Sequence, residues 1–433
     1  MIDINLVREN LELVKNNIKK KFKNEKLVVV DEIQKLDEKW RKLKFDEDKL
    51  RAERNNISKS ISELKKTGKS TGILMRKAKQ IPKNIEKIQI QRKEFENKIN
   101  SLLKQIPNII HDSVPIGKDA NENVELKKIG ELKIPNYEIF NHAELAERLN
   151  GVDFDSARDT SGNGFYFLIG DLALFHSAVL AFARDYMIKQ GFVYVIPPFM
   201  IRKKVVEGVM SFVEMENMMY KIENEDLYLI GTSEHSMIGR FVDKIIDGRK
   251  LPITLTSYSP CFRIEVGAHV MEEKGLFRLH QFEKQEMIVI CEPEDSYKWY
   301  DKMKDFTVEV FRQLNIPVRI LECCSGDLAD LKAKSCDIEA WSPRQKKYWE
   351  AGSCSNLTDA QARRLNIRIN NKGKFYFAHT LNNTVLASPR ALIALMENNQ
   401  NRDGAINIPK VLQPYMDGKK KIEISLNKQD TNK

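Results

Sequence analysis

Two apolar seams of the same spacing constrain the first quarter of this chain more than any other feature. Between residues 33 and 64, and again between 74 and 106, seam positions recur at alternating steps of three and four. This spacing is typical of helices that pack as a coiled coil. The polar stretch 66–72 contains two glycines and separates the seams, which favours a tight turn. We therefore predict an antiparallel pair of long helices over about residues 28–106.

Two of the polar residues that interrupt the seams carry opposite charges. If the helices pair so that Ile57 faces Ile81, then Glu47 lies opposite Arg92. This register predicts a salt bridge across the coil, which can fix the pairing even where it adds little net stability. Pro82 has no backbone N–H and crowds the preceding turn, so we expect a kink or a local break in the second helix.

Positive charge is concentrated in the same quarter. The chain has a net charge of +10, and the first 105 residues carry an even larger positive charge, because the rest of the chain is slightly negative. Around the turn, residues 59–79 hold seven Lys or Arg and one acidic residue. Such a surface fits a solvated or oligomerising coil, or an arm that binds nucleic-acid phosphates. Few aromatic residues lie among the charges, so an arm would read shape and phosphates rather than bases.

Composition divides the chain into two predicted domains. Residues 2–20 form one amphipathic helical pattern that belongs with the coil. The stretch 108–136 is polar, contains proline and glycine, and is interpreted as a linker. We therefore place an N-terminal domain at residues 1–112 and a second domain at 113–433.

Cellular location and redox state are predicted from patterns that the sequence lacks. No apolar run is long enough to span a bilayer, and the N-terminus does not read as a signal peptide. The six cysteines form no Cys-x-x-Cys pair and no zinc spacing with histidine. We expect a cytoplasmic protein with reduced thiols, no membrane partner and no zinc site.

The second domain is organised around the stretch 261–286. Two alternating runs, joined by a long loop between Gly267 and Gly275, predict a β-hairpin with Arg263 and Glu265 on its first strand. One face of the second strand carries Arg278, His280, Phe282, Lys284 and Glu286. This face fits a solvated sheet surface or a nucleotide site. In such a site arginine would bind phosphate, the ring would lie under a base and a carboxylate would bind an ammonium group.

Two smaller clusters combine residue types that bind polar ligands. Thr232 and Glu234 directly follow a predicted strand at 226–230 and can face the same way. Glu350 and Ser353 lie on another predicted strand, where a carboxylate and a hydroxyl provide oxygen ligands suited to magnesium. Each cluster alone is equally compatible with a structural role.

A helix start near the C-terminus points to an anion. A strand is predicted at 375–381, and residues 382–387 follow it. Ser388 is expected to cap the next helix, with Pro389 first and Arg390 second. An arginine in the first turn opposes the helix dipole, so it is tolerated more readily where an anion binds.

Taken in order, these motifs resemble the seryl-tRNA synthetases, a family of class II aminoacyl-tRNA synthetases. The segments are MIDINLVREN at the start, the basic helical hairpin, TSE at 232–234, FRIE at 262–265, RLHQFEKQE at 278–286, WEAGSCSN at 349–356, DAQARRLNIR at 359–368 and TLNNTVLASPRALIALMENNQ at 380–400. The resemblance covers essentially the whole chain. It implies an α+β fold, in which a class II antiparallel sheet with flanking helices follows an N-terminal two-helix coiled-coil arm.

The resemblance also implies a function. Members of the family are homodimers that use L-serine, ATP and Mg²⁺ to form seryl-adenylate, and then transfer the seryl group to the 3′ end of tRNA(Ser). Some also serylate tRNA(Sec). The implied tRNA-binding residues of the arm are Arg51, Arg54, Lys59, Lys65, Lys66, Lys69, Arg76, Lys77 and Lys79.

By position in the motifs, the resemblance implies a set of site residues. Those for ATP are Arg263, Ile264, Glu265, Leu279, Phe282, Glu350, Ala351, Gly352, Ser353 and Arg390. Those for serine are Thr232, Ser233, Glu234, Arg263, Glu286 and Thr384. Arg263 is expected at the α-phosphate, Phe282 under adenine and Arg390 at the γ-phosphate. The implied catalytic residues are Arg263, Glu265 and Arg390, and the implied metal ligands are Glu350 and Ser353.

The sequence departs from the family pattern at two places. Ser233 stands where the family has alanine, and the loop from Gly267 to Gly275 keeps its length but has altered charges. The loop bears on contacts with the tRNA acceptor end more than on adenylation. Two other functions compete with an active synthetase: a catalytically silent tRNA-binding paralogue, and a ligase that loads amino acids onto a carrier protein. The intact arm disfavours the carrier-protein ligase, and the retained charged residues disfavour the silent paralogue.

Overall fold

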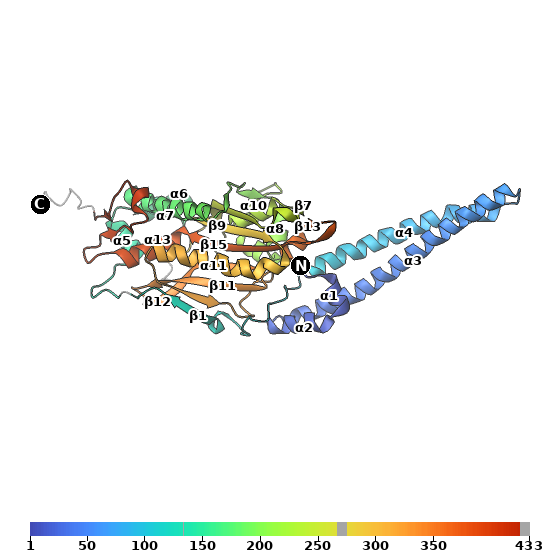
Figure 1. Cartoon of the computed structure of the whole chain (residues 1–433). Coiled ribbons are helices and arrows are strands. Elements are labelled where there is room, and N and C mark those ends of the chain that lie inside the picture. Colours follow the sequence, from blue (N-terminus) through green and yellow to red (C-terminus); the bar gives the residue numbers. More distant parts are fainter. Residues whose placement is uncertain (133, 266–274, 425–433) are drawn as a thin grey trace. The chain divides into compact units, whose positions relative to one another are not determined.

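The computed structural model describes residues 1–132, 134–265 and 275–424 (Figure 1). The altered loop between Gly267 and Gly275 therefore lies outside the described residues, apart from Gly275 itself. Contacts divide the chain into two compact units, Met1–Pro107 and Asn108 onward. In the described part of the chain, no helix is both long enough and apolar enough to cross a membrane.

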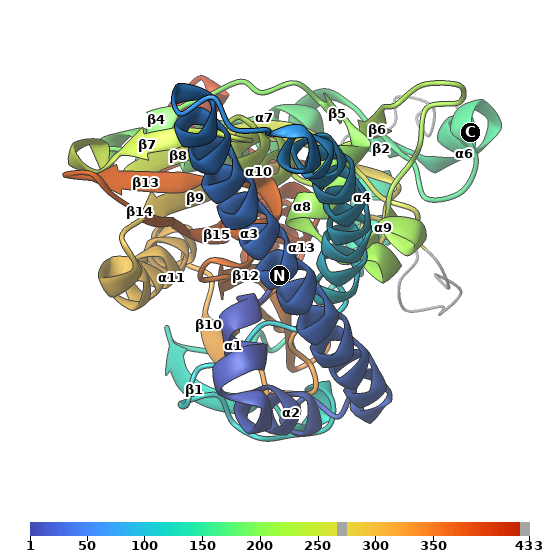
Figure 2. The ribbon, with the colours of Figure 1, turned by 90° about the vertical axis from the view of Figure 1, so that its right-hand side faces the viewer.

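The first unit is a helical hairpin with two short helices before it. Its long helices are α3, Leu27–Lys66, and α4, Gly72–Leu103, which lie side by side and antiparallel (Figures 1 and 2). The predicted helical pair is confirmed. The single helix predicted at 2–20 is wrong, because α1, Ile4–Glu9, ends at Asn10 and α2, Leu11–Lys20, begins after it. The Asn10 side chain caps α2 by accepting a hydrogen bond from the backbone of Leu13.

The predicted charge pair lies inside the coil and confirms the inferred pairing. Arg92 Nη1 lies 3.3 Å from Glu47 Oε2, and the Glu47 side chain is only 1% exposed. Arg51 and Gln89 also donate hydrogen bonds to this carboxylate, which the seam pattern did not predict. Burial alone would raise the pKa of Glu47, but these two donors and the Arg92 charge outweigh burial and lower it.

We expect Glu47→Ala to loosen the middle of the arm, because it leaves two arginines and an amide without their shared acceptor. The expected loss is about 1–3 kcal/mol of local stability. Amide hydrogen exchange along α3 measures this as faster exchange around position 47. Glu53→Ala is the matched control, since Glu53 is exposed on the same helix. Equal exchange in both variants would contradict a role for the buried carboxylate.

Pro82 does not interrupt the second helix. Helix α4 continues through it from Gly72 to Leu103, so the expected local break is wrong, while the alternative of a kink stays a prediction. Ile81 and Ile85 flank the proline and are buried against Ile57 of α3. This packing offsets the backbone hydrogen bond that proline cannot make.

The second unit is built on a large sheet, which confirms the predicted α+β class. Its order is β1-β10-β11-β12-β15-β9-β8-β4, and all neighbours are antiparallel except β4 and β8. In that order the strands are Val124–Ile129, Val318–Glu322, Lys334–Ser342, Lys347–Asn356, His379–Ala387, Gln281–Cys291, Ile253–Phe262 and Val193–Tyr194. A smaller sheet combines β7, β13 and β14, at Ile245–Asp247, Arg368–Asn371 and Lys374–Phe377.

Helices cover the large sheet, and the apolar core of this unit lies between the helices and the strands. Helices α7, α11 and α13 pack their buried apolar side chains against the central strands (Figure 1). Gly191 follows the C-terminal end of α7 with φ +86°, a left-handed backbone conformation that favours glycine. The helices of this unit are α5 His142–Arg148, α6 Phe154–Ser161, α7 Gly170–Lys189, α8 Lys203–Val209, α9 Phe212–Met218, α10 Ser233–Gly239, α11 Ser296–Gln313, α12 Ala360–Leu365 and α13 Ser388–Asn399.

The predicted linker at 108–136 is wrong, because this stretch belongs to the second unit. The buried Asn108 amide donates hydrogen bonds to the carbonyl groups of Leu331 and Leu357, at 3.0 and 2.8 Å. Further along, β1 pairs with β10 at the edge of the large sheet. Almost every residue of β1 is exposed, so its sequence lacks the apolar alternation that would have identified a strand.

Candidate active site

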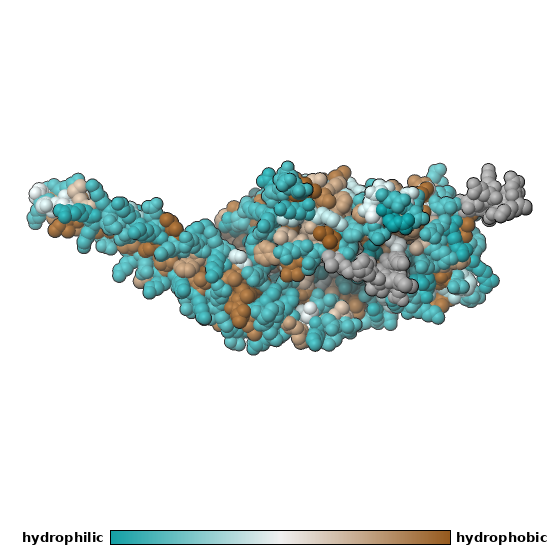
Figure 3. All heavy atoms as spheres, turned by 180° about the vertical axis from the view of Figure 1, so that it is seen from behind, coloured by the Kyte–Doolittle hydropathy of each residue, from teal (hydrophilic) through white to brown (hydrophobic). Residues whose placement is uncertain are grey.

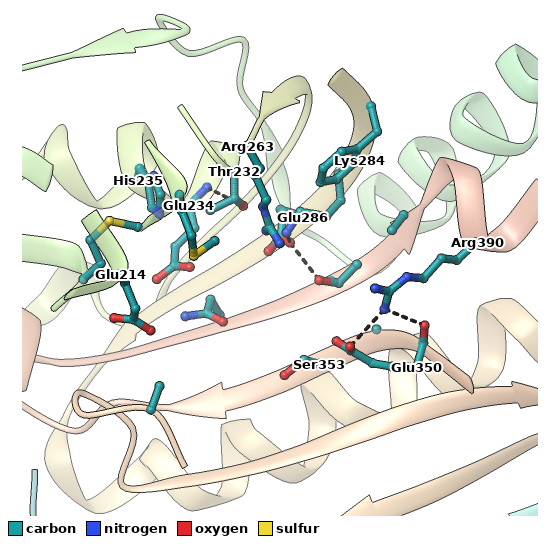
Figure 4. A pocket seen from close by; sticks show the side chains of 18 of the residues that line it. Glu214, Thr232, Glu234, His235, Arg263, Lys284, Glu286, Glu350, Ser353 and Arg390 are labelled. Atoms are coloured by element: carbon teal, nitrogen blue, oxygen red, sulfur yellow. Dashed lines mark hydrogen bonds and ion pairs between the residues drawn. The ribbon is translucent and has the colours of Figure 1, made fainter. Parts of the chain in front are cut away.

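A pocket of about 390 Å³ opens in the second unit (Figure 4). It combines residues that the sequence analysis selected from separate motifs. Those lining it are Thr232, Glu234, Arg263, Glu265, Leu279, Phe282, Glu286, Glu350, Ala351, Gly352, Ser353, Thr384 and Arg390. The structure does not bring Ser233 or Ile264 into this lining, and Ser233 is fully buried.

Local structure explains how the central hairpin presents its residues. Strands β8 and β9 pair so that Cys261 faces Phe282 and Ser257 faces Glu286. Strand β8 ends at Phe262 and β9 begins only at Gln281, so the expected strand positions of Arg263, Glu265 and residues 277–280 are wrong. Nevertheless Phe277, Arg278 and Leu279 also line the pocket from the turn that precedes the strand.

His280 does not line the pocket, although strand alternation placed it beside Phe282. Its ring stacks on Phe165 at 5.4 Å between centroids, and its Nδ1 lies 2.7 Å from the Tyr220 hydroxyl. Nδ1 also donates to the Arg263 carbonyl at 3.1 Å. His280 therefore supports the backbone at Arg263 from behind the pocket.

One end of the pocket contains two carboxylates on different elements. Glu234 lies in the first turn of α10, whose N-cap is Thr232, and Glu286 lies on β9. Thr384 Oγ1 donates to Glu286 Oε1 at 2.8 Å, and Lys284 forms an ion pair with the same oxygen. This end is suited to binding an ammonium group and a small hydroxyl.

Among the described residues a cation is paired with only one of these two carboxylates, since Lys284 lies against Glu286. Burial, reinforced by the nearby Glu286 charge, raises the pKa of Glu234 to about 7. Next to it, burial and then the Arg263 charge lower the pKa of His235 to about 3, so its imidazole is neutral at physiological pH. The His235 side chain lines the pocket and is 5% exposed.

Arg263 lies between the carboxylate end and the aromatic ring of Phe282. Its Nε donates to the Gly231 carbonyl at 3.2 Å, and its guanidinium carbon is 5.3 Å from the Phe282 ring centroid. These contacts hold the arginine while its terminal nitrogens remain directed at the pocket (Figure 4). Glu265 also lies beside the pocket, 3.9 Å from Arg278.

The opposite end of the pocket is formed by Arg390 and Glu350. Arg390 Nη1 donates to the Glu350 backbone carbonyl at 2.8 Å and to its carboxylate at 2.9 Å (Figure 4). Burial alone would raise the pKa of Glu350, but the charge and hydrogen bond of Arg390 together with the charges of Lys332 and Arg263 outweigh burial and lower the pKa. The guanidinium carbon also lies 5.2 Å from the Phe277 ring centroid.

The helix start at Arg390 differs from the prediction. Residues 382–387 continue strand β15 rather than following it, and Ala387 is the N-cap of α13. Ser388 is buried, its hydroxyl has no hydrogen-bond partner among the described residues, and it caps nothing. Arg390 still lies in the first turn and points into the pocket, as expected.

A metal ion could bind here only if a bound substrate supplied some of its oxygen ligands. Glu350 and Ser353 both line the pocket and offer a carboxylate and a hydroxyl oxygen. In the described part of the chain, no group of three or more His, Cys, Asp or Glu residues could hold a metal alone. Mg²⁺ commonly uses one or two protein oxygens together with phosphate oxygens and water, so this donor set fits it beside a nucleotide.

Several polar residues of the site were missed. Lys332 lines the pocket and lies 3.5 Å from the Ser353 hydroxyl. Asp337 faces Ser353 across the β11–β12 pair, and burial together with the Glu350 charge raises its pKa to about 7. Glu214 lines the pocket from α9. Lys284 lies on the polar face of the predicted hairpin, but the sequence indicated no role for it.

Comparisons with known proteins cover both units. Residues 1–110 match the family model "Seryl-tRNA synthetase N-terminal domain", and residues 218–399 match "tRNA synthetase class II core domain (G, H, P, S and T)". A serine–tRNA ligase of Methanocella arvoryzae is 44% identical over 421 residues, which cover 96% of this chain and 99% of the relative. One from Pyrococcus horikoshii is 43% identical over 437 residues, with 96% of each chain covered.

Solved structures show the same similarity. The crystal structure of Pyrococcus horikoshii seryl-tRNA synthetase complexed with ATP has a TM-score of 0.93 at 42% identity, covering 98% of this chain and 100% of that one. The Naegleria fowleri cytoplasmic enzyme in complex with AMP has a TM-score of 0.89 at 30% identity, covering 98% of this chain and 99% of that one.

Proposed function

The chain belongs to the seryl-tRNA synthetase family, and from this premise we propose that it is a serine–tRNA ligase. It would activate L-serine with ATP to seryl-adenylate and then transfer the seryl group to tRNA(Ser). One observation carries the proposal. A single pocket has two carboxylates at one end and an arginine–carboxylate pair at the other, and Arg263 lies between the two ends.

In the first step a serine carboxylate oxygen attacks the α-phosphorus of ATP, and the bond to the bridging oxygen of pyrophosphate breaks. Glu234 and Glu286 would hold the ammonium group, while Thr232 and Thr384, which also line the pocket, would contact the serine hydroxyl. Arg263 would stabilise the charge that develops on the α-phosphate. The nucleophile is already a carboxylate, so alignment and charge stabilisation are enough and no general base is required.

The nucleotide would occupy the other end of the pocket. Phe282 would stack on adenine, Arg390 would bind the γ-phosphate, and Glu265, Leu279, Ala351 and Gly352 would line the nucleotide. Glu350 and Ser353 are the residues that would hold Mg²⁺, which supplies charge neutralisation at the phosphates. Arg390 would then exchange part of its contact with Glu350 for phosphate.

The basic arm would bind the tRNA. All nine of its proposed binding residues are exposed, although Arg51 also hydrogen-bonds to Glu47. Figure 3 shows hydrophilic residues over most of this hairpin on the face drawn. A homodimer is proposed as well, and exposed apolar side chains of α7 and β4, including Leu174, Ile188 and Val193, are compatible with one. The tRNA(Sec) substrate and the cytoplasmic location stay predictions.

Serine-dependent exchange between pyrophosphate and ATP tests the proposal directly. The expected result is exchange with L-serine that other amino acids do not support at equal concentration. Absence of exchange with every amino acid, together with retained tRNA binding, would favour a silent tRNA-binding paralogue. Amino-acid exchange in a protein that does not aminoacylate tRNA would favour a ligase for a carrier protein.

In the same assay, kcat/KM for serine should fall towards low pH as the Glu234 carboxylate becomes protonated. A carboxylate with a pKa of about 7 is increasingly protonated below pH 7, and its neutral form attracts the ammonium group of serine less. We therefore expect kcat/KM for serine to fall about tenfold per pH unit well below pH 7. Glu234→Gln should be less active and should lose this acid limb of the pH profile. If kcat/KM of Glu234→Gln falls at low pH as it does in the wild type, a titrating group other than Glu234 causes the fall.

A further inference from the structure

A fully buried amide lies directly behind the carboxylate end of the pocket. Gln361 is on α12, is 0% exposed and does not belong to the pocket lining. Its Nε2 donates to Glu234 Oε1 at 2.8 Å and to the Val209 backbone carbonyl at 3.3 Å. Its Oε1 accepts a hydrogen bond from Thr380 Oγ1 at 2.7 Å. Three elements therefore meet at this side chain: α8, α10 and β15.

These contacts allow only one orientation of the amide. The Val209 carbonyl can only accept a hydrogen bond, so the NH₂ group must face it and Glu234. With the amide turned over, the Gln361 oxygen would face a carbonyl and a carboxylate, and the NH₂ group would face the Thr380 hydroxyl. Thr380 is itself fully buried and fixed in β15, where its carbonyl accepts from Leu357 and its N–H donates to Thr358.

No other side chain in the described part of the chain donates a hydrogen bond to the Glu234 carboxylate. The charged groups that act on it are Glu286 and Lys284 from β9 and Lys332 from the loop before β11. Lys284 pairs with Glu286 instead. The position of Glu234 thus depends on a neutral donor, whereas Glu286 is held by a cation and a hydroxyl.

We propose that Gln361, oriented by Thr380, is a positioning residue that fixes the Glu234 carboxylate for the ammonium group of the amino-acid substrate. The inference rests on the proposed function, because it assigns Glu234 to serine. Neither Gln361 nor Thr380 lines the pocket, so both act only through Glu234. Their removal should weaken the use of serine and leave the use of ATP nearly unchanged.

The test compares two substitutions of similar size in pyrophosphate exchange. Thr380→Val removes the hydroxyl and keeps the shape, and Gln361→Met removes the amide and keeps the length. We expect KM for serine to rise about tenfold in Thr380→Val and more in Gln361→Met, as the loss of a buried hydrogen bond predicts. KM for ATP should change less than about twofold. Thr380→Ser keeps the hydroxyl and should restore most of the affinity for serine.

The pH profile separates positioning from general damage to the fold. The Gln361 donor lowers the pKa of Glu234, so its removal should move the acid limb of kcat/KM for serine to higher pH. A merely structural defect would affect both substrates and leave the midpoint of that limb in place. Either equal effects on serine and ATP or an unmoved limb in folded Gln361→Met would overturn the inference.

The wild-type protein distinguishes the two possible failures. If it exchanges pyrophosphate with serine and Gln361→Met has the same KM for serine, only the positioning role is refuted. If the wild type exchanges with no amino acid, the proposed function fails and this inference fails with it. Circular dichroism of each variant verifies folding, and Thr380→Val supplies the result if Gln361→Met does not fold.

Discussion

Arg263→Ala is expected to lower serine-dependent pyrophosphate exchange by about 10²–10³-fold or more, the usual cost of losing one preorganised donor to a developing charge. Arg263 lies in the middle of the pocket, with Glu286 towards one side and Phe282 under its guanidinium group. No other arginine in the described part of the pocket is anchored to the Gly231 carbonyl at the base of α10. The loss should appear mainly in kcat, because the α-phosphate gains its charge in the transition state.

The controls separate charge from geometry and from folding. Arg263→Lys keeps a cation but loses the planar fork and the contact of Nε with Gly231, so it should recover only a small part of the activity. Arg402→Ala removes an exposed arginine outside the pocket and should behave like the wild type. Near-normal exchange by a folded Arg263→Ala protein would refute the placement of the α-phosphate beside this residue.

The sequence could predict those parts of the site that lie on regular strands. Alternation along β9 identified Phe282, Lys284 and Glu286, because residues two apart share a face of a strand. The same rule failed for His280, which precedes the strand and packs behind it on Phe165. Alternation carries no information where a turn replaces the strand.

The sequence indicated no role for the residues that support the site from other elements, although Gln361 lies in the family-like segment DAQARRLNIR. Gln361 and Lys332 lie in short segments without a periodic pattern, and their contacts are with residues far away in the chain. A buried polar residue is recognisable only once its partner is known, and that partner is set by tertiary structure. The edge strand β1 was missed for a related reason, since an exposed strand carries no apolar face.

Shortening the helical arm should separate the two proposed activities. Replacing residues 45–93 by a short glycine-rich turn removes the basic end of the hairpin. The buried base of the first unit is kept, including Ile33, Leu36, Ile99 and Leu103. The pocket is lined only by residues of the second unit, so exchange with serine should stay within about twofold of the wild type. Aminoacylation of tRNA(Ser) should fall by about 10²-fold or more, because phosphate contacts supply much of the affinity for nucleic acid.

A point-charge version tests the same idea without removing structure. The exposed lysines at the turn, Lys65, Lys66 and Lys69, are changed together to alanine. If each contacts a phosphate, the slope of log affinity against log salt should fall by about two to three. The matched control changes Lys35, Lys39 and Lys42, which are also exposed on α3 nearer its start, and should leave the slope unchanged. Equal loss of exchange and aminoacylation in the shortened protein would contradict a separable arm, and equal slopes in the two triple variants would place the tRNA elsewhere.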